Sequence, residues 1–330
     1  MPVKSYTYIF EEFGGSDVLH WKEVELPEPG VGQVLVRHEA IGVNYIDIYH
    51  RTGQFAAPLP LPSGLGMEGA GIVEAVGADV AGLMVGDRVA YAGGPPGAYS
   101  TSRLVPAARA VKIPDSIPSD IAAALLFKGL TAEYLITRCY SVQGGDTVLF
   151  HAAAGGVGQI ACQWLNHLGA NVIGTVSSEA KAVVAKENGC HHVINYSSEN
   201  FVERVRELTG GKGVDVTYDS VGLDTFLGSV DCVKVRGTVV SFGATSGPVP
   251  LLDVSLLGAK GSIYLTRPSI AHYTAVRNEL EASAAAVFDK IEKGIIRTDN
   301  ISRYSLKDAA QAHMDLESRR TSGALILIPD

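Results

Sequence analysis

The segment from Thr147 to Gly158 constrains the fold of this chain more than any other part of its sequence. Residues 147–151 are rich in β-branched and aromatic side chains and follow the turn pair Gly144-Gly145, which predicts a short buried strand. Residues 157–168 have helical spacing and end at Gly169. Between the strand and the helix stand three small residues, Ala153, Gly155 and Gly158, at the spacing of a dinucleotide-binding turn.

This spacing has a physical cause. The first small residue makes the tight turn, the second lets the backbone approach a pyrophosphate, and the third lets the helix pack on the strand. The helix N-terminus then presents free N–H groups and a partial positive charge to the phosphates, so Gly155, Gly156 and Val157 are candidate cofactor contacts. A glycine-rich turn can also join a strand to a helix without any ligand, so the surrounding sequence has to decide.

Strands and helices alternate from residue 147 to about residue 266. The predicted strands are 147–151, 171–176, 193–196, 214–218, 237–242 and 262–266, and the predicted helices are 157–168, 179–188, 198–209 and 223–233. Ser198 is predicted to cap the third of these helices. Six strands joined by crossovers predict an α/β fold with a doubly wound parallel sheet, which is the setting that a dinucleotide turn requires.

The two ends of the chain have a different sequence pattern from the alternating segment between them. Residues 1 to about 125 read as short strands separated by Gly/Pro turns, and the predicted strands are 33–40, 69–76, 87–91 and 109–113. A helix is expected to begin near Ser119-Asp120, and a long helix is expected over 273–292. A final strand over 324–329 is expected to return to the first, β-rich domain.

Composition excludes several classes of protein. The chain has 330 residues, 46% of them hydrophobic, which suggests two domains, and no apolar run reaches the ~18 residues of a transmembrane helix. The net charge of −8 and the absence of a basic block argue against nucleic acid or an anionic membrane as a partner. The four cysteines are widely spaced, which fits a reducing cytoplasm better than a disulfide framework.

The sequence resembles the medium-chain dehydrogenase/reductase superfamily, in its zinc-free quinone oxidoreductase branch, which is zeta-crystallin-like. The motifs that carry the resemblance run over almost the whole chain: 40–47, 49–53, 66–73, 85–89, 128–132, 152–158, 218–222 and 317–319. The resemblance implies a GroES-like catalytic domain from residues 1–125 and 270–330, and a Rossmann NADPH-binding domain from residues 126–269. Members of this branch are usually homodimers or larger. The resemblance therefore implies a homodimer that reduces quinones, by hydride or electron transfer from NADPH, at a cleft between the domains.

The resemblance also bears on metals. Zinc-dependent members of the superfamily use a cysteine where this chain has Asn44 and a histidine where it has Met67. An amide and a thioether are poor zinc ligands, so no metal site is expected. The cluster Cys190-His191-His192 is interpreted as a polar turn. Without a Lewis acid to activate an alcohol, the substrate is expected to be an electrophile such as a quinone or an activated alkene.

The end of the second predicted strand bears on the choice of cofactor. It reads Val176-Ser177-Ser178 and lacks the carboxylate that would bind the ribose 2′-hydroxyl of NAD. Ser177, Lys181 and Tyr196 suit a 2′-phosphate instead, and the resemblance adds Arg319 to this group. The alternative for Lys181 is an ordinary solvated lysine on a helix.

The resemblance places further residues around the rest of NADPH: Asn44, Tyr45, Asp47, Tyr49, Thr131, Ser220, Phe242, Gly243, Leu265 and Arg267. Hydride transfer is chemistry of the cofactor, so the protein has to supply orientation and electrostatics. Tyr45, Tyr49 and Arg267 are the candidates for stabilising a developing anion on the acceptor, and each tyrosine could equally be a packing residue. No residue stands out as an indispensable acid or base.

Three other functions remain open. The same branch contains alkenal and enoyl double-bond reductases, which would differ in the acceptor pocket. Some zeta-crystallin relatives bind AU-rich RNA, but the net charge of −8 and the lack of a basic stripe argue against that as the main role. A purely structural, crystallin-like role would leave the dinucleotide turn without a purpose.

The last strand of the nucleotide domain bears on assembly. Residues 261–265 are expected to form the edge of the sheet, with Ile263 and Leu265 as exposed apolar residues. Exposed apolar edges tend to pair with another chain. The sequence therefore predicts a homodimer formed by pairing of two such edges, in a two-fold arrangement.

Overall fold

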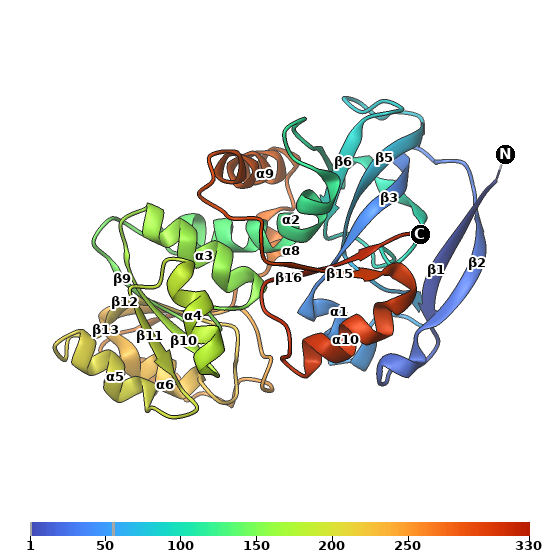
Figure 1. Ribbon diagram of the computed structural model, residues 1–330. Coiled ribbons are helices and arrows are strands. Elements are labelled where there is room, and N and C mark those ends of the chain that lie inside the picture. The colour runs from blue at the N-terminus through green and yellow to red at the C-terminus, as the bar shows by residue number, and fades with distance from the viewer. Residues whose placement is uncertain (1, 55–56) are drawn as a thin grey trace. The chain divides into compact units, whose positions relative to one another are not determined.

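The computed structural model describes residues 2–54 and 57–330, which form two compact units (Figure 1). The first unit comprises the described residues up to Lys128, together with Thr274–Glu292 and Thr298–Asp330. The second unit comprises Gly129–Tyr273 and Lys293–Arg297. Helix α2, Ser119–Glu133, carries the chain from the first unit into the second.

The first unit is rich in β structure. Its strands are β1 Val3–Phe10, β2 His20–Leu26, β3 Gln33–Val43, β4 Ser63–Gly64, β5 Glu68–Val76, β6 Arg88–Ala92, β7 Ser102–Pro106, β8 Ala110–Lys112, β15 Ile301–Ser305 and β16 Ala324–Ile328. Its other helices are α1 Tyr45–Thr52, α9 Arg277–Glu292 and α10 Ala309–Glu317, with short 3₁₀ turns at Ser16–Val18, Ala107–Arg109 and Leu306–Asp308. The strands form one sheet of three and one of seven.

Both ends of the chain contribute to the larger sheet of the first unit. Its order is β15-β16-β3-β5-β6-β8, with β7 paired to β3. The C-terminal strand β16 pairs antiparallel with β3, and Leu325 and Leu327 lie in the same core as Val36 and Ile41. Figure 1 shows the red C-terminal strands beside blue β3. The predicted return of the tail to the β-rich domain is therefore confirmed.

The second unit contains one parallel sheet of six strands. These strands are β9 Thr147–Phe150, β10 Asn171–Val176, β11 His192–Asn195, β12 Val214–Asp219, β13 Val233–Ser241 and β14 Tyr264–Thr266, in the order β11-β10-β9-β12-β13-β14. The helices are α3 Gly156–His167, α4 Glu179–Glu187, α5 Phe201–Leu208, α6 Phe226–Cys232, α7 Ser255–Ala259 and α8 Ile270–Tyr273, and a π-helical turn spans Tyr134–Cys139. The order of the strands is that of a doubly wound dinucleotide-binding fold, as predicted.

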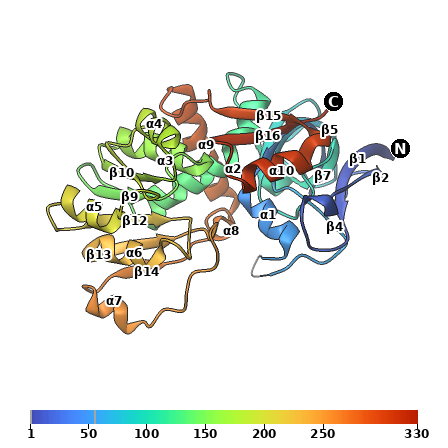
Figure 2. The same ribbon diagram turned by 60° about the horizontal axis from the view of Figure 1, so that its bottom comes forward.

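Helices cover both faces of this sheet. Helices α3 and α4 pack against β10, and α6 packs against β12 and β13 with α5 beside it (Figure 2). The strands of a doubly covered parallel sheet are hydrophobic along their whole length, which is why β9 and β10 were recognisable from sequence. Leu149, Ile173 and Ile194 from neighbouring strands meet in its core.

The structure corrects two helix boundaries. Helix α5 is capped by Asn200, whose side chain accepts hydrogen bonds from the N–H groups of Val202 and Glu203, and not by Ser198. Both residue types cap helices well, so sequence alone does not separate two candidates two positions apart. The long C-terminal helix begins at Arg277 rather than at residue 273, because the preceding turn, Ile270–Tyr273, forms the separate short helix α8.

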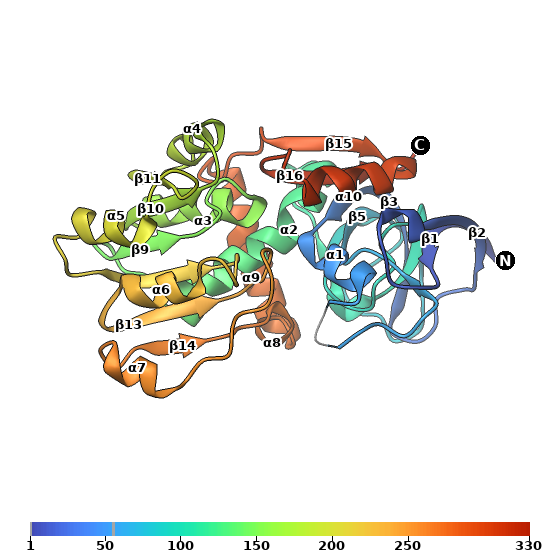
Figure 3. The same cartoon turned by 90° about the horizontal axis from the view of Figure 1, so that it is seen from below.

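Strand β14 lies at the edge of the six-stranded sheet, as predicted (Figure 3). The expected pair of exposed apolar residues is different, however. Ile263 is buried in the core of the second unit, whereas Tyr264 and Leu265 are exposed. Ile263, the residue before β14, turns inward to fill the core, so it is not one of the exposed apolar residues at this edge.

Among the described residues, no helix combines the length and the apolar character needed to cross a membrane.

Candidate functional site

The predicted contacts in the second unit follow the carboxyl ends of its parallel strands. Ser177 follows β10, Tyr196 follows β11, Ser220 follows β12, and Phe242 and Gly243 follow β13. Strands β9 and β12 are neighbours in the sheet although their chain connections leave in opposite directions. Open α/β sheets bind ligands at this kind of switch point, outside the carboxyl ends of the strands.

The turn after β9 approaches its neighbours too closely for side chains. A Cβ added to Gly158 would overlap the carbonyl oxygen of Ala152 and would lie 2.8 Å from two backbone atoms of Ala153. Helix α3 therefore packs directly on this turn, which is the role predicted for the third small residue. The tight turn itself is at Ala152, which has a φ of 54°, one position before the predicted Ala153.

The N-terminus of α3 begins with a residue that has no capping side chain. Gly155 is the N-cap residue of α3, and a glycine has no side-chain oxygen to accept hydrogen bonds from the first N–H groups of the helix. Helix N-termini that follow glycine turns bind phosphate through these groups and the helix dipole. The missing Cβ of Gly158 and the open N-cap at Gly155 fit the pyrophosphate of a dinucleotide.

A buried network of hydrogen bonds, which the sequence did not predict, connects the ends of three strands. The Ser229 hydroxyl donates to Asp219 Oδ2 at 2.6 Å, and His151 Nε2 lies 3.0 Å from the Ser229 oxygen. His151 Nδ1 lies 2.9 Å from the Thr175 hydroxyl, and burial lowers the pKa of His151. Because the serine hydroxyl is already donating, a neutral His151 donates from Nε2 and accepts at Nδ1.

Asp219 also shapes the turn that carries Ser220. Its Oδ1 accepts hydrogen bonds from the N–H groups of Val221 and Gly222 at 2.8 and 3.0 Å. Asp219 belongs to the motif 218–222 on which the resemblance partly rests, so that motif was the available signal for this role. His151 had no such signal, because its partners are distant in sequence.

The tip of β10 lacks an acid, as the sequence indicated. Ser178 caps α4, and its hydroxyl accepts a hydrogen bond from the Lys181 N–H at 3.4 Å. The Glu179 carboxylate accepts a hydrogen bond from Asn195 Nδ2 at 2.7 Å. The side chains of Ser177, Lys181 and Tyr196 are half-buried. Each therefore packs partly against the protein and is partly accessible to a ligand.

Arg267 follows β14 and is held by the neighbouring strand end. Its Nη1 donates to the Ser241 hydroxyl at 3.0 Å and to the Gly243 carbonyl at 2.8 Å. Leu265, two residues earlier, is exposed at the same edge. Thr131, on α2, is buried.

In the first unit, the predicted residues 44 to 49 form the start of α1, a helix that the sequence did not predict. Asn44 is its N-cap residue, and the Asn44 N–H donates to Asp47 Oδ2 at 2.9 Å. Tyr45 and Tyr49 are one helical turn apart, with their ring centroids 5.2 Å apart in an edge-on arrangement. Both tyrosines are half-buried.

Asp47, in the first turn of α1, belongs to a buried chain of hydrogen bonds. The Tyr99 hydroxyl donates to Asp47 Oδ2 at 3.0 Å, and His313 Nε2 lies 2.9 Å from the Tyr99 oxygen. Burial raises the pKa of Asp47 to about 7, although the Asn44 N–H and the Tyr99 hydroxyl both favour the carboxylate. Burial also lowers the pKa of His313 to about 3, so this imidazole is neutral.

Asn44 is also held from the side of β5. Its Nδ2 donates to Glu68 Oε2 at 2.8 Å, and the Phe127 N–H donates to Glu68 Oε1 at 2.6 Å. Gly42 makes room for this carboxylate, because a Cβ there would overlap Glu68 Oε2. The Asn44 amide is thus used as a hydrogen-bond donor to a buried carboxylate.

Arg319 lies after α10 and is exposed, with a φ of 58°. Within residues 2–54 and 57–330, no group of three or more His, Cys, Asp or Glu side chains is arranged to hold a metal ion. In the cluster at residues 190–192, the His191 Nδ1 atom instead accepts a hydrogen bond from the Val172 N–H at 3.1 Å.

Comparison with known families and structures agrees with this geometry. Residues 30–115 match the model of the alcohol dehydrogenase GroES-like domain, and residues 156–287 match that of zinc-binding dehydrogenases. The chain is 50% identical to a quinone oxidoreductase of Pseudomonas aeruginosa, over 97% of this chain and 98% of that protein.

Two further relatives are informative. A 2-haloacrylate reductase of a Burkholderia species is 45% identical, over 97% of this chain and 98% of the relative. The crystal structure of Escherichia coli quinone oxidoreductase complexed with NADPH has a TM-score of 0.95 and 45% identity, covering 98% of this chain and 100% of that one. The chain belongs to the quinone oxidoreductase branch of the medium-chain dehydrogenase/reductase superfamily.

Proposed function

We propose that this protein is an NADPH-dependent quinone oxidoreductase. The observation that carries the proposal is the match over nearly the whole chain, at 50% identity, to a quinone oxidoreductase. The glycine turn at the switch point of the sheet, and the tip of β10 without an acid, support NADPH as its cofactor.

Particular residues would hold each part of NADPH. The N–H groups of Gly155, Gly156 and Val157 would bind the pyrophosphate at the start of α3. Lys181, with Ser177, Tyr196 and Arg319, would bind the 2′-phosphate, since a lysine ammonium and an arginine guanidinium are strong partners for phosphate. The remaining contacts would come from Asn44, Tyr45, Tyr49, Thr131, Ser220, Phe242, Gly243, Leu265 and Arg267.

Asp47 would support the cofactor site without contacting the cofactor. Its side chain is fully buried, and it binds the Asn44 N–H and the Tyr99 hydroxyl. We therefore assign it to fixing Asn44 and the start of α1 rather than to touching the cofactor.

When bound, NADPH supplies a hydride, which is two electrons and one hydrogen nucleus, to the acceptor. The residues of the chain have to orient the acceptor and stabilise the charge that it gains. Tyr45 and Tyr49 are half-buried phenols on α1, and Arg267 is a fixed guanidinium. Each can donate a hydrogen bond to an anionic oxygen.

The proposal is tested by following the near-ultraviolet absorbance of NADPH and of NADH against quinones, enals and enoyl thioesters. Quinones with NADPH should give the highest kcat/KM, and prior dialysis against a strong chelator should leave the rate unchanged. A protein that oxidises NADPH with none of these acceptors, or only after zinc is added, contradicts the proposal.

The second candidate is an NADPH-dependent alkene reductase. The observation that favours it is the 45% identity to a 2-haloacrylate reductase. In that case the protein must also deliver a proton to carbon, because an alkene anion is less stabilised than a hydroquinone anion. A turnover number for enals or haloacrylates well above that for every quinone tested would select this candidate.

The Tyr49→Phe variant separates the two candidates. For a quinone, we expect a loss of only a few-fold in kcat, because no proton has to be delivered to carbon and Tyr45 and Arg267 would remain as donors. Loss of a true general acid costs ~10²–10⁴-fold. A loss in that range, with NADPH binding intact by fluorescence titration, would show that Tyr49 supplies a proton and would favour the alkene reductase.

The Lys181→Ala variant tests the choice of cofactor. A charge-assisted phosphate contact contributes about 1.5–3 kcal/mol, so NADPH affinity should fall roughly ten- to a hundred-fold while NADH affinity barely changes. Lys186→Ala is the matched control, since Lys186 is an exposed lysine in the last turn of the same helix. Equal losses for both cofactors would refute the assignment of Lys181.

We also propose a homodimer formed through β14. Tyr264 is 64% exposed at this edge, and exposed apolar edges tend to pair. Light scattering should give twice the mass of the chain, and Tyr264→Lys should shift it toward the monomer. Val85→Lys, a change of an equally exposed residue in the first unit, should not. If the unmodified protein is a monomer by light scattering, the proposal of a homodimer is wrong.

The same resemblance assigns the catalytic role to residues 1–125 and 270–330 and NADPH binding to residues 126–269, as a GroES-like and a Rossmann domain. A cytoplasmic location is also proposed, since all four cysteines are free thiols, of which Cys162, Cys190 and Cys232 are buried. Cell fractionation tests the location, and recovery with the secreted proteins would contradict it.

A further inference from the structure

Lysine and glutamate form an ion pair in the interior of the first unit. Lys128 Nζ lies 3.4 Å from Glu68 Oε2, and the two side chains are 7% and 0% exposed. Taking two charges out of water is costly, and such a pair often stabilises a protein no better than apolar residues of the same size. An interior ion pair therefore calls for a reason other than stability.

Glu68 does not depend on this lysine for its hydrogen bonds. Its two oxygens already accept the Asn44 Nδ2 group at 2.8 Å and the Phe127 N–H at 2.6 Å. The ammonium is more distant than the 2.7–2.9 Å of a full charge-assisted bond. Among the residues that the structure describes, Glu68 Oε2 is the acceptor that Lys128 contacts, and an ammonium carries three donors. Lys128 therefore retains N–H groups for a further acceptor.

The position of Lys128 fits an acceptor that is reduced by NADPH. Glu68 joins Lys128 to Asn44, a residue that we assign to the cofactor. Thr131, also assigned to the cofactor, is three residues after Lys128 on α2, so the two share a face of that helix. The Glu68 side chain is fully enclosed, whereas 7% of the Lys128 side chain is exposed, so the lysine is the member of the pair that contacts solvent.

We propose that the Lys128 ammonium is a catalytic group that binds the acceptor oxygen and stabilises the negative charge formed on it. This inference rests on the proposed function. NADPH, when bound, would supply a hydride: its nicotinamide C–H bond would break, and the hydrogen would go with both electrons to one quinone oxygen, where an O–H bond would form. NADPH would be oxidised, and the quinone would become a hydroquinone monoanion with the charge on its other oxygen. The anionic oxygen accepts a hydrogen bond from Lys128, which stays protonated, and water supplies the last proton.

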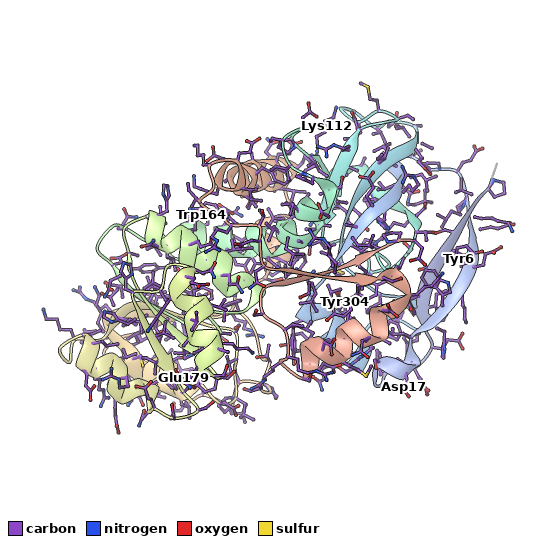
Figure 4. All side chains as sticks on the ribbon, viewed as in Figure 1. Tyr6, Asp17, Lys112, Trp164, Glu179 and Tyr304 are labelled. Carbon is purple, nitrogen blue, oxygen red and sulfur yellow. The ribbon has the colours of Figure 1, made fainter. Side chains whose placement is uncertain are left out.

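The kinetic test replaces the charge and keeps the length of the side chain. A preorganised donor of this kind contributes about 10²–10³-fold to kcat. Lys128→Met should therefore lower kcat for a quinone by about a hundred-fold, with little change in NADPH affinity by fluorescence titration. Lys112→Met is the matched control, because Lys112 lies at the outside of the first unit, 51% exposed and paired with Asp87 (Figure 4). It should behave like the unmodified protein.

A second variant tests the inference even if Lys128→Met alone does not fold. Lys128→Met alone leaves the Glu68 charge buried and unpaired, which can be strongly destabilising. Glu68→Gln combined with Lys128→Met removes both charges. The glutamine oxygen can still accept the Phe127 N–H, and its nitrogen can donate to the Asn44 amide oxygen. The same fall in kcat is expected in this double variant. Unchanged kcat in either folded variant overturns the inference.

A spectroscopic readout does not depend on turnover. The probe is para-nitrophenol, whose phenolate resembles a hydroquinone monoanion, bound to the protein in the presence of NADP⁺. The Lys128 ammonium should make the bound phenol ionise at lower pH than in water. This shift should be smaller in the double variant, in which the positive nicotinamide ring of NADP⁺ acts without the lysine. An equal shift in both proteins contradicts the inference.

These outcomes separate the two proposals. If the unmodified protein reduces quinones with NADPH and the Lys128 variants match it, the inference about Lys128 is wrong and the proposed function stands. If the unmodified protein reduces no quinone, the proposed function fails and the inference fails with it.

Discussion

Gly158→Ala should weaken NADPH binding by roughly ten- to a hundred-fold. The added Cβ would overlap the Ala152 carbonyl oxygen and lie 2.8 Å from backbone atoms of Ala153, so either α3 or the turn has to move. Overpacking of this kind costs about 1–3 kcal/mol. Because the same turn and helix end would bind the pyrophosphate, the displacement is expected to appear as lost affinity, measured by fluorescence titration of NADPH.

Gly258→Ala is the matched control for this substitution. Gly258 lies in α7, and a Cβ there meets no atom within 4 Å. Alanine also has the higher helix propensity, so this variant should be at least as stable as the unmodified protein and should bind NADPH normally. Equal affinities for Gly158→Ala and Gly258→Ala would show that the turn after β9 does not carry the pyrophosphate.

Asp47→Asn should remove a pH dependence from the stability of the protein. Burial raises the pKa of Asp47 to about 7 from its ordinary 3.8. Between these values the folded protein keeps a proton that the unfolded chain has released, so the free energy of unfolding falls as the pH rises. From about pH 5 to pH 8, the unmodified protein should lose about 2–3 kcal/mol relative to Asp47→Asn.

Denaturant unfolding of both proteins across this pH range measures the difference. Asp253→Asn is a useful control, because the pKa of Asp253 is held below its usual value by hydrogen bonds from Ser255, so it does not titrate in this range. Its effect on stability should be the same at every pH. A constant difference between the unmodified protein and Asp47→Asn would show that Asp47 remains ionised throughout.

Much of the second unit was predictable from the sequence because its signals are local. Strands β9 and β10 are short apolar runs bounded by glycine, and α3 follows at once with helical spacing. The parallel order of the sheet then follows from the alternation of strands and helices. The exact turn residue, Ala152 rather than Ala153, depends on backbone angles that a pattern of small residues does not specify.

The supports of the site were not predictable, because their partners are far apart in the chain. Asp47 meets Tyr99 and His313 only after both ends of the chain have joined one unit. Lys128 reaches Glu68 from a helix sixty residues later, and neither residue type indicates a partner by spacing. Helix α1 was missed because it is short and most stable in its tertiary setting, where Asn44 and Asp47 are fixed from both sides.

Measuring the loss of NADPH and the formation of hydroquinone in the same anaerobic sample tests whether this protein passes electrons from NADPH to a quinone. One hydroquinone should form for each NADPH oxidised, at a rate well above that with NADH and unaffected by a chelator. Consumption of NADPH without hydroquinone, or an equal rate with NADH, would contradict the assignment of this protein as an NADPH-dependent quinone oxidoreductase.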